Sequence, residues 1–196
     1  MLVDNHEVEN KEPSLKKIEF LIGSPRMKGN THLMAGMLEG GLNKDNFTSN
    51  IKHLYDYDIN PCVDCRGCKK DKMVCILKDQ MQDIYPCLED ADIIIIGTPI
   101  YWYSPSATMK LLLDRMRPYY ANKKLAGKSL ALLLPAGSGA SDCDLTIELF
   151  KRFADALELK YIGAAAAQAY DIGEVNNDQE AKASIEELVK YINGAV

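Results

Sequence analysis

Ala91-Asp-Ile-Ile-Ile-Ile-Gly97 is the stretch of sequence that decides the fold. Its four consecutive isoleucines leave neither face of a strand polar, and such runs are typical of strands that are buried on both sides. Parallel sheets bury both faces because helices cover each of them. The segment therefore predicts a central strand of a parallel α/β sheet.

Shorter apolar segments on both sides of this strand alternate with helical patterns, which predicts a doubly wound domain. We expect strands at 17–23, 48–55, 91–97, 129–134 and 160–167, and helices at 30–43, 79–90, 106–115, 141–158 and 179–193. Asn30 or Thr31 is expected to cap the first helix. Pro86 lies deep in the second helix and predicts a kink or a break there. The expected fold is a five-stranded parallel sheet of order 2-1-3-4-5 with helices on both faces.

Size and composition indicate one globular domain. The chain has 196 residues, with 47% hydrophobic and 26% charged residues and a formal net charge of −5. This charge argues against a nucleic-acid partner, and no apolar run approaches the roughly 20 residues that cross a bilayer. We expect residues 1–16, which are polar and acid-rich, to be a mobile tail and not a secretion signal, and residues 17–196 to be the domain. We also expect a cytoplasmic location.

The segment Ser24-Pro-Arg-Met-Lys-Gly-Asn-Thr31 connects the first strand to the first helix. Its hydroxyl, guanidinium and amide donors surround a helix start, where backbone N–H groups and the helix dipole favour an anion. An ordinary capped turn is the alternative, but it would not require Arg26, Asn30 and Thr31 together. Asn30 stands where a Walker A loop has its lysine, so we expect a phosphate cradle and not an NTPase.

Two further loops leave the carboxyl ends of expected strands, where α/β sheets bind ligands. Thr98-Pro-Ile-Tyr-Trp-Tyr103 places three aromatic residues together, which suits either a flat heterocycle or a subunit contact. Gly137-Ser-Gly139 resembles a dinucleotide fingerprint, but Asp142 stands where the third glycine belongs. A flexible turn is an equally good interpretation of that loop. A pyridine nucleotide would therefore dock against another cofactor.

Four of the six cysteines form a C-x2-C-x2-C-x6-C pattern at Cys62, Cys65, Cys68 and Cys75. Close spacing in a chain without an export signal indicates a metal or iron–sulfur site and not disulfides. Four thiolates suit a [4Fe-4S] cluster or tetrahedral zinc, and a remnant motif that binds no metal is the alternative. The remaining two, Cys87 and Cys143, are expected to be packed helix residues. The three histidines are scattered in the sequence, and we expect each at the surface.

Taken together and in this order, the motifs resemble the NADPH-dependent FMN reductase superfamily and, within it, the iron–sulfur flavoproteins. The resemblance covers roughly residues 17 to 190. The matching segments are Gly23-Ser-Pro-Arg26, Gly29-Asn-Thr31, Asp58-Ile-Asn-Pro-Cys62 with its three partner cysteines, Gly97-Thr-Pro-Ile-Tyr-Trp102, Ser106-Ala-x-x-Lys110 and Leu113-Asp-Arg115.

This resemblance implies a flavodoxin-like fold that binds FMN noncovalently, with flavins at the boundaries of a homodimer or homotetramer. It places the phosphate at Ser24, Arg26, Gly29, Asn30 and Thr31. It places the isoalloxazine ring against Pro99, Ile100, Tyr101 and Trp102, and against Ala136, Gly137, Ser138 and Gly139. It makes Cys62, Cys65, Cys68 and Cys75, within a cysteine-rich insert at 60–77, the ligands of a [4Fe-4S] cluster near the flavin.

The expected activity is that of an FMN oxidoreductase in which the flavin carries the chemistry and no side chain is a catalytic acid or base. A ferredoxin-like protein or NAD(P)H would supply electrons, and a small molecule such as a quinone or an oxygen species would accept them. One alternative is an NAD(P)H-dependent FMN or quinone reductase whose cysteines are vestigial or hold zinc. Another is an electron carrier or redox sensor without a substrate. We expect neither a nucleic acid nor a membrane as a partner.

Overall fold

Five parallel strands form the central sheet of the computed structural model, which describes residues 15–70 and 72–195. The strands lie in the order β2-β1-β3-β6-β7, which is 2-1-3-4-5 in chain order, and the predicted sheet is confirmed. Their bounds are β1 Lys16–Ile22, β2 Phe47–His53, β3 Ile93–Gly97, β6 Ser129–Ala136 and β7 Lys160–Gln168.

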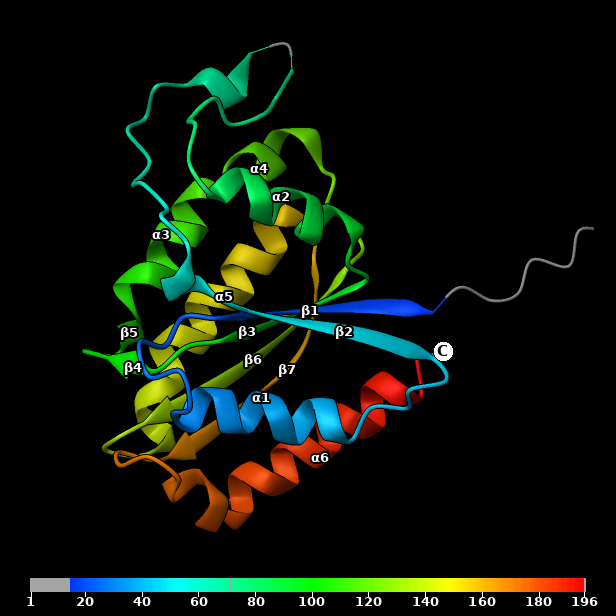
Figure 1. Ribbon diagram of the computed structural model, residues 1–196, viewed down its shortest axis with the longest axis vertical. Helices are drawn as coiled ribbons and strands as arrows, with labels where there is room; N and C mark the ends of the chain where they lie inside the picture. Colours follow the sequence, from blue (N-terminus) through cyan, green and yellow to red (C-terminus); the bar gives the residue numbers. More distant parts are fainter. Residues whose placement is uncertain (1–14, 71, 196) are drawn as a thin grey trace, which may run out of the picture.

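Helices cover both faces of this sheet (Figure 1). One face carries α1 (Asn30–Gly40) and α6 (Gln179–Asn193), and the other carries α2 (Met81–Asp90), α3 (Ala107–Arg115), the short α4 (Pro118–Asn122) and α5 (Asp144–Leu157). Short 3₁₀ turns are η1 Leu54–Asp56, η2 Gly67–Lys69, η3 Ala140–Cys143 and η4 Glu174–Asn177.

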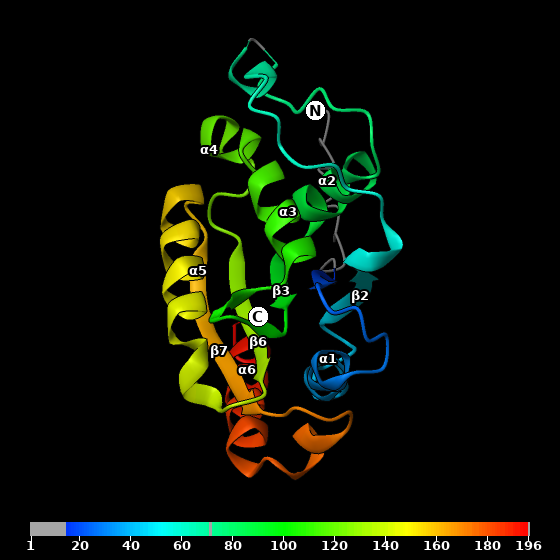
Figure 2. The same cartoon turned by 90° about the vertical axis from the view of Figure 1, so that its left-hand side faces the viewer.

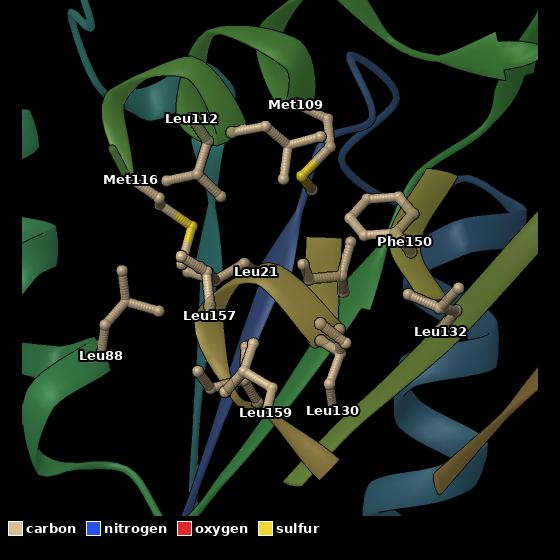
Figure 3. Packing of buried hydrophobic residues seen from close by; sticks show 14 of the residues in the cluster. Leu21, Leu88, Met109, Leu112, Met116, Leu130, Leu132, Phe150, Leu157 and Leu159 are labelled. Carbon is tan, nitrogen blue, oxygen red and sulfur yellow. The ribbon is translucent and has the colours of Figure 1, made fainter. Parts of the chain in front are cut away.

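The isoleucine run of β3 contributes to two separate cores, because successive side chains of a strand point to opposite faces. Ile93 and Ile95 pack in the core beneath α1 and α6. Ile94 and Ile96 pack in the core formed with the helices of the other face, part of which Figure 3 shows. Both faces of β3 are thus buried, which explains why the run contains no polar residue.

Several helices differ from expectation in their detail. The first helix has Gly29 at its N-cap and no capping side chain, so the expected cap at Asn30 or Thr31 is wrong. Of the kink or break expected at Pro86, the break is wrong, because α2 continues through this residue to Asp90. Proline removes only one N–H donor there, and the buried side chains of Met81, Ile84 and Leu88 hold the helix against the core.

The aromatic loop after β3 contains a small hairpin of β4 (Ile100–Tyr101) and β5 (Ser104–Pro105), in antiparallel pairing. Its two turn residues have positive φ, 51° at Trp102 and 62° at Tyr103. This is the backbone twist of a type I′ hairpin turn, which normally takes asparagine or glycine. Bulky residues in this conformation cost free energy and are found at ligand sites.

Little of the predicted tail can be compared with the structure. The first strand begins at Lys16, one residue inside the predicted tail, and residues 1–14 lie outside the described part of the chain. Within 15–70 and 72–195, every helix is too short or too polar to cross a membrane.

Candidate functional site

A cavity of about 700 Å³ lies at the carboxyl end of the sheet, the end that faces the viewer in Figure 2. This is where α/β sheets bind their ligands, and the volume is typical of a ligand pocket. The loops that follow β1, β3, β6 and β7 line it. Its residues are Ser24, Arg26, Asn30, Thr31, Pro99, Ile100, Tyr101, Trp102, Pro135, Gly137, Ser138, Ala169 and Tyr170.

Three loops that we singled out from the sequence meet in this cavity. Of the thirteen residues expected to bind a cofactor, ten line it, and Gly29, Ala136 and Gly139 do not. Gly29 instead allows the loop to close tightly, because a Cβ atom there would lie 2.8 Å from the Cβ atom of Arg26. Ala136 is buried as the last residue of β6. The cavity lining thus agrees with the expected grouping of loops.

One end of the cavity is suited to an anion. The first turn of α1 has no side-chain cap, so its backbone N–H groups are available to a ligand. Ser24 Oγ accepts a hydrogen bond from the backbone N–H of Arg26 at 3.2 Å, which shapes the loop. Thr31 lies at the same helix start and is 1% exposed. The guanidinium of Arg26 adds a positive charge, so this end can bind a phosphate group.

The other end of the cavity is aromatic. Tyr101 and Trp102 come from the hairpin, and Trp102 is 92% exposed. The hairpin is anchored to the anion end through Ser106, whose Oγ donates to the Gly23 carbonyl at 2.5 Å and accepts from Met109 N. Ser106 N in turn donates to Thr98 Oγ1 at 3.0 Å. These contacts hold the two ends of the cavity in a fixed relation.

The loop after β7 is the part of the site that the sequence analysis missed. Its Tyr170 and Ala169 line the cavity. Arg26 Nη1 donates to the Tyr170 carbonyl at 2.8 Å, and Asn30 Nδ2 donates to the Asp171 carbonyl at 2.8 Å. A signal was present in the sequence, because this loop also leaves the carboxyl end of a strand of the sheet.

The family is decided by a match over most of the chain. The model of the NADPH-dependent FMN reductase family matches residues 16–171, which span every part of the cavity. The chain belongs to the NADPH-dependent FMN reductase family. The expected family and the flavodoxin-like fold are therefore confirmed.

Individual relatives of this FMN reductase family member agree with that assignment. An iron–sulfur flavoprotein of Methanocaldococcus jannaschii is 30% identical over 137 residues, 70% of this chain and 70% of that protein. An iron–sulfur flavoprotein of Archaeoglobus fulgidus is 29% identical over 165 residues, 84% of this chain and 74% of that one.

Solved structures of low sequence identity share the fold. The Trp repressor binding protein from Bacillus subtilis matches with a TM-score of 0.68 and 19% identity, over 87% of this chain and 96% of that one. An NAD(P)H:quinone oxidoreductase from Methanothermobacter marburgensis matches with a TM-score of 0.70 and 12% identity, over 93% of this chain and 96% of that one.

The residues of the cavity fit FMN, the flavin of this family's name. An uncapped helix start with a nearby guanidinium suits a phosphate, and the aromatic hairpin suits a flat ring. The cavity is also large enough to enclose a ligand of drug-like size.

The cysteine-rich segment forms a loop that projects beyond α2 and α4 in both views (Figures 1 and 2). Its base is closed by Arg115, whose side chain is fully buried and pairs with Asp79, 2% exposed. Arg115 Nη1 also donates to the Asn60 carbonyl at 2.8 Å, and Asp79 accepts from Asn60 N at 2.9 Å. A buried charge pair therefore joins the two segments, at Asn60 and Asp79, where the loop begins and ends.

The four patterned cysteines do not converge within this loop. Cys62 and Cys65 are exposed, whereas Cys75 is half-buried in a separate pocket with Tyr85 and Tyr119. No three His, Cys, Asp or Glu side chains of the described residues are grouped so that they could hold a metal. Four thiols are the donor set of a [4Fe-4S] cluster, so the residues fit a cluster in kind but not in this arrangement.

The two other cysteines lie in packed positions. Cys143 is fully buried in η3, and burial, with Asp142 and Asp144 nearby, raises the pKa of its thiol to about 12. Cys87 is half-buried on α2, and its thiol donates to the Asp83 carbonyl at 3.4 Å. Cys143 is packed as the sequence predicted, although in a 3₁₀ turn, whereas Cys87 lies on a helix as predicted but is only half-buried.

Two histidines form a pair that the sequence analysis placed separately at the surface. The rings of His32 in α1 and His53 at the end of β2 lie 5.1 Å apart between centroids, and the Nδ1 atoms of both are buried without a partner among the described residues. Burial, then the charge of His32, lowers the pKa of His53, although Asp56 opposes the shift. Both side chains are half-buried, so each is only partly at the surface, and their pairing was not predicted.

Proposed function

We propose that this chain is an FMN-dependent oxidoreductase that binds FMN in the cavity and passes electrons from a reduced donor to a small acceptor. The observation that carries the proposal is the cavity itself, in which an uncapped helix start with Arg26 and an exposed aromatic hairpin form the two ends. Bound FMN would supply the redox chemistry, because flavins exchange hydrides or single electrons.

The protein's own residues would bind and orient the cofactor. Arg26 and the first-turn N–H groups of α1 would hold the phosphate, with Ser24 and Thr31 beside them. The backbone of Pro99 and Ile100 and the ring of Tyr101 would contact the isoalloxazine and exclude water from one side of it. Gly137 and Ser138 would leave room for the ring on another side. No step in this scheme requires a side chain to donate or remove a proton.

For the electron donor, the family description favours NADPH. The Gly137-Ser-Gly139 loop lacks a third glycine and is part of the flavin cavity, so a nicotinamide would have to approach the flavin directly. The open position of Trp102, 92% exposed, leaves that approach free in a single chain. A ferredoxin-like donor is the second candidate, because Lys69, Lys70 and Lys72 make the cysteine loop basic.

A [4Fe-4S] cluster on the cysteine loop is part of the proposal only as a bound group, and we assign no electron step to it. Its support is the four-cysteine pattern and the description of the relatives as iron–sulfur flavoproteins. The loop would have to rearrange so that Cys75 leaves its pocket beside Tyr85. Zinc, or no metal, are the alternatives.

A homodimer or homotetramer would complete the site. Tyr101, Trp102 and Tyr103 are all exposed large side chains on one hairpin, and exposed aromatic groups of this kind mark subunit contacts.

All six cysteines are free thiols, which a reducing compartment preserves, and we propose a cytoplasmic location on that basis.

Anaerobic purification followed by spectroscopy, metal analysis and turnover tests the proposal. FMN that binds and is bleached by NADPH supports the reductase, with iron in about four atoms per chain adding the cluster. FMN that binds without turnover of any quinone or oxygen acceptor would instead favour the electron carrier or redox sensor. A folded protein that binds no FMN would refute the proposal.

A further inference from the structure

The loop after β7 is held against the 24–31 loop by more hydrogen bonds than an exposed connection requires. The side-chain amide of Asn30 makes two hydrogen bonds to the loop after β7. Its Nδ2 donates to the Asp171 carbonyl at 2.8 Å, and its Oδ1 accepts from Gly173 N at 2.9 Å. Arg26 Nη1 donates to the Tyr170 carbonyl at 2.8 Å. Both residues were expected to hold a phosphate, yet both contact this loop.

The loop is also ordered from within and from its other side. Glu174 Oε2 accepts from the backbone N–H groups of Tyr170 at 2.7 Å and Asp171 at 3.0 Å. Ala169 N donates to the Ala136 carbonyl at 2.9 Å, which continues the pairing of β7 with β6. Gly173 has φ +93°, a conformation that favours glycine. The backbone of this loop is therefore fixed before any ligand arrives.

What this rigid loop presents to the cavity is the ring of Tyr170. The side chain is 70% exposed, and it packs so closely on Gly137 that a Cβ atom there would lie 2.8 Å from Tyr170 Cδ2. None of the hydrogen bonds that hold the loop uses the phenol. An aromatic ring that is carried by a fixed backbone and has its surface open to a cavity is well suited to contact a ligand, because little conformational entropy of the loop is lost on binding.

We propose that Tyr170 contacts the bound flavin and that Asn30 is a positioning residue that holds Tyr170 in place. This inference rests on the proposed function, because it assigns a further residue to the same cofactor site. Tyr170 adjoins Arg26 through its backbone and Gly137 through its ring, and thus bridges the anion end of the cavity and the 136–139 loop. The contact therefore involves the flavin beyond its phosphate.

Binding of FMN and of riboflavin, which lacks the phosphate, distinguishes this role from phosphate binding. Tyr170→Leu should weaken the binding of both flavins by about tenfold, equivalent to about 1.4 kcal/mol, and Tyr170→Phe should retain it. Asn30→Ala should also weaken both. In the Tyr170→Leu background, Asn30→Ala should cause little further loss, because a residue that acts through another gives a non-additive cycle.

Two control variants and a folding measurement complete the experiment. Thr31→Val should weaken FMN alone, and Tyr120→Leu, which removes a 63% exposed tyrosine on α4, should change neither affinity. Circular dichroism of the flavin-free proteins establishes folding. If Asn30→Ala does not fold, the affinity of Asn30→Asp for riboflavin is measured in its place.

The inference is overturned if Tyr170→Leu binds both flavins like the wild type. It is overturned for Asn30 if Asn30→Ala weakens the binding of FMN but not of riboflavin. It is also overturned for Asn30 if the loss of affinity caused by Asn30→Ala adds fully to the loss caused by Tyr170→Leu. If the wild-type protein binds neither flavin, the proposed function fails instead, so the two failures are distinguishable.

Discussion

Replacement of Arg115 by methionine tests how the cysteine loop is attached to the fold. The Arg115 side chain is fully buried, and its Nη2 lies 3.0 Å from Asp79 Oδ1, while Nη1 contacts the other carboxylate oxygen. Methionine fills a similar volume but leaves the Asp79 carboxylate, 2% exposed, without its charged partner. Removal of one member of a buried ion pair costs about 3–5 kcal/mol.

The expected loss lies at the lower end of this range, for two reasons. Arg115 Nε is buried without a hydrogen-bond partner among the described residues, so the wild-type protein already bears part of the desolvation cost. The backbone N–H groups of Asn60 and Met81 still donate to Asp79 after the change. We therefore expect Arg115→Met to lower the free energy of unfolding by about 3 kcal/mol.

Urea unfolding of the flavin-free protein measures this loss, and Arg117→Met is the matched control. Arg117 pairs with Asp64 at the surface, where the two side chains are 39% and 54% exposed, so its loss should change stability far less than Arg115→Met does. Trypsin should also cut the loop, at Arg66 or its lysines, faster in Arg115→Met than in Arg117→Met. Equal stability of the two variants would refute the role of the buried Arg115–Asp79 pair in attaching the loop.

Three further predictions concern Arg26, the cysteine pattern and the histidine pair. Arg26→Ala should weaken FMN binding by about 1.5–3 kcal/mol, the value of a charged hydrogen bond, in a fluorescence titration; unchanged affinity would remove Arg26 from the phosphate site. Cys65→Ser should abolish bound iron while Cys87→Ser retains it, and iron that survives Cys65→Ser would mean that the four thiols are not one site. Burial, then His32, lowers the pKa of His53, so protonation of this residue disfavours the folded state. The melting temperature should therefore be highest above about pH 6.5, the pKa of an unperturbed histidine, and should fall at lower pH. If His53→Gln leaves this pH dependence unaltered, that histidine is excluded as the cause.

The fold was predictable because its strongest signals are local. The isoleucine run of β3 needs only its own composition to indicate a strand buried on both faces. The last helix, α6, has the predicted bounds Gln179–Asn193 because its buried residues recur at helical spacing and Asp178 caps it through the N–H of Ala181.

The errors arise where distant segments meet. The helix expected at 141–158 begins only at Asp144, because residues 141–143 belong to the 3₁₀ turn η3. The pairing of His32 with His53 depends on β1 and β2 lying side by side.

The site followed from sequence only in part, for the same reason. The loops 24–31, 98–103 and 135–139 carry unusual residues and therefore attract notice. Tyr170 does not, because its role depends on hydrogen bonds to Arg26 and on a close approach to Gly137, residues far away in the chain. Similarly, no local pattern indicates that Arg115 is buried against Asp79, which lies 36 positions earlier.

The central claim is that the cavity at the carboxyl end of the sheet is an FMN site with its phosphate end at α1. A crystal structure of the protein with FMN tests this most directly. We predict the phosphate at the backbone N–H groups of the first turn of α1 beside Arg26, and the isoalloxazine ring between Tyr101 and the 136–139 loop. Electron density for FMN elsewhere on the protein, or an ordered cavity that stays free of FMN at saturating concentration, would contradict it.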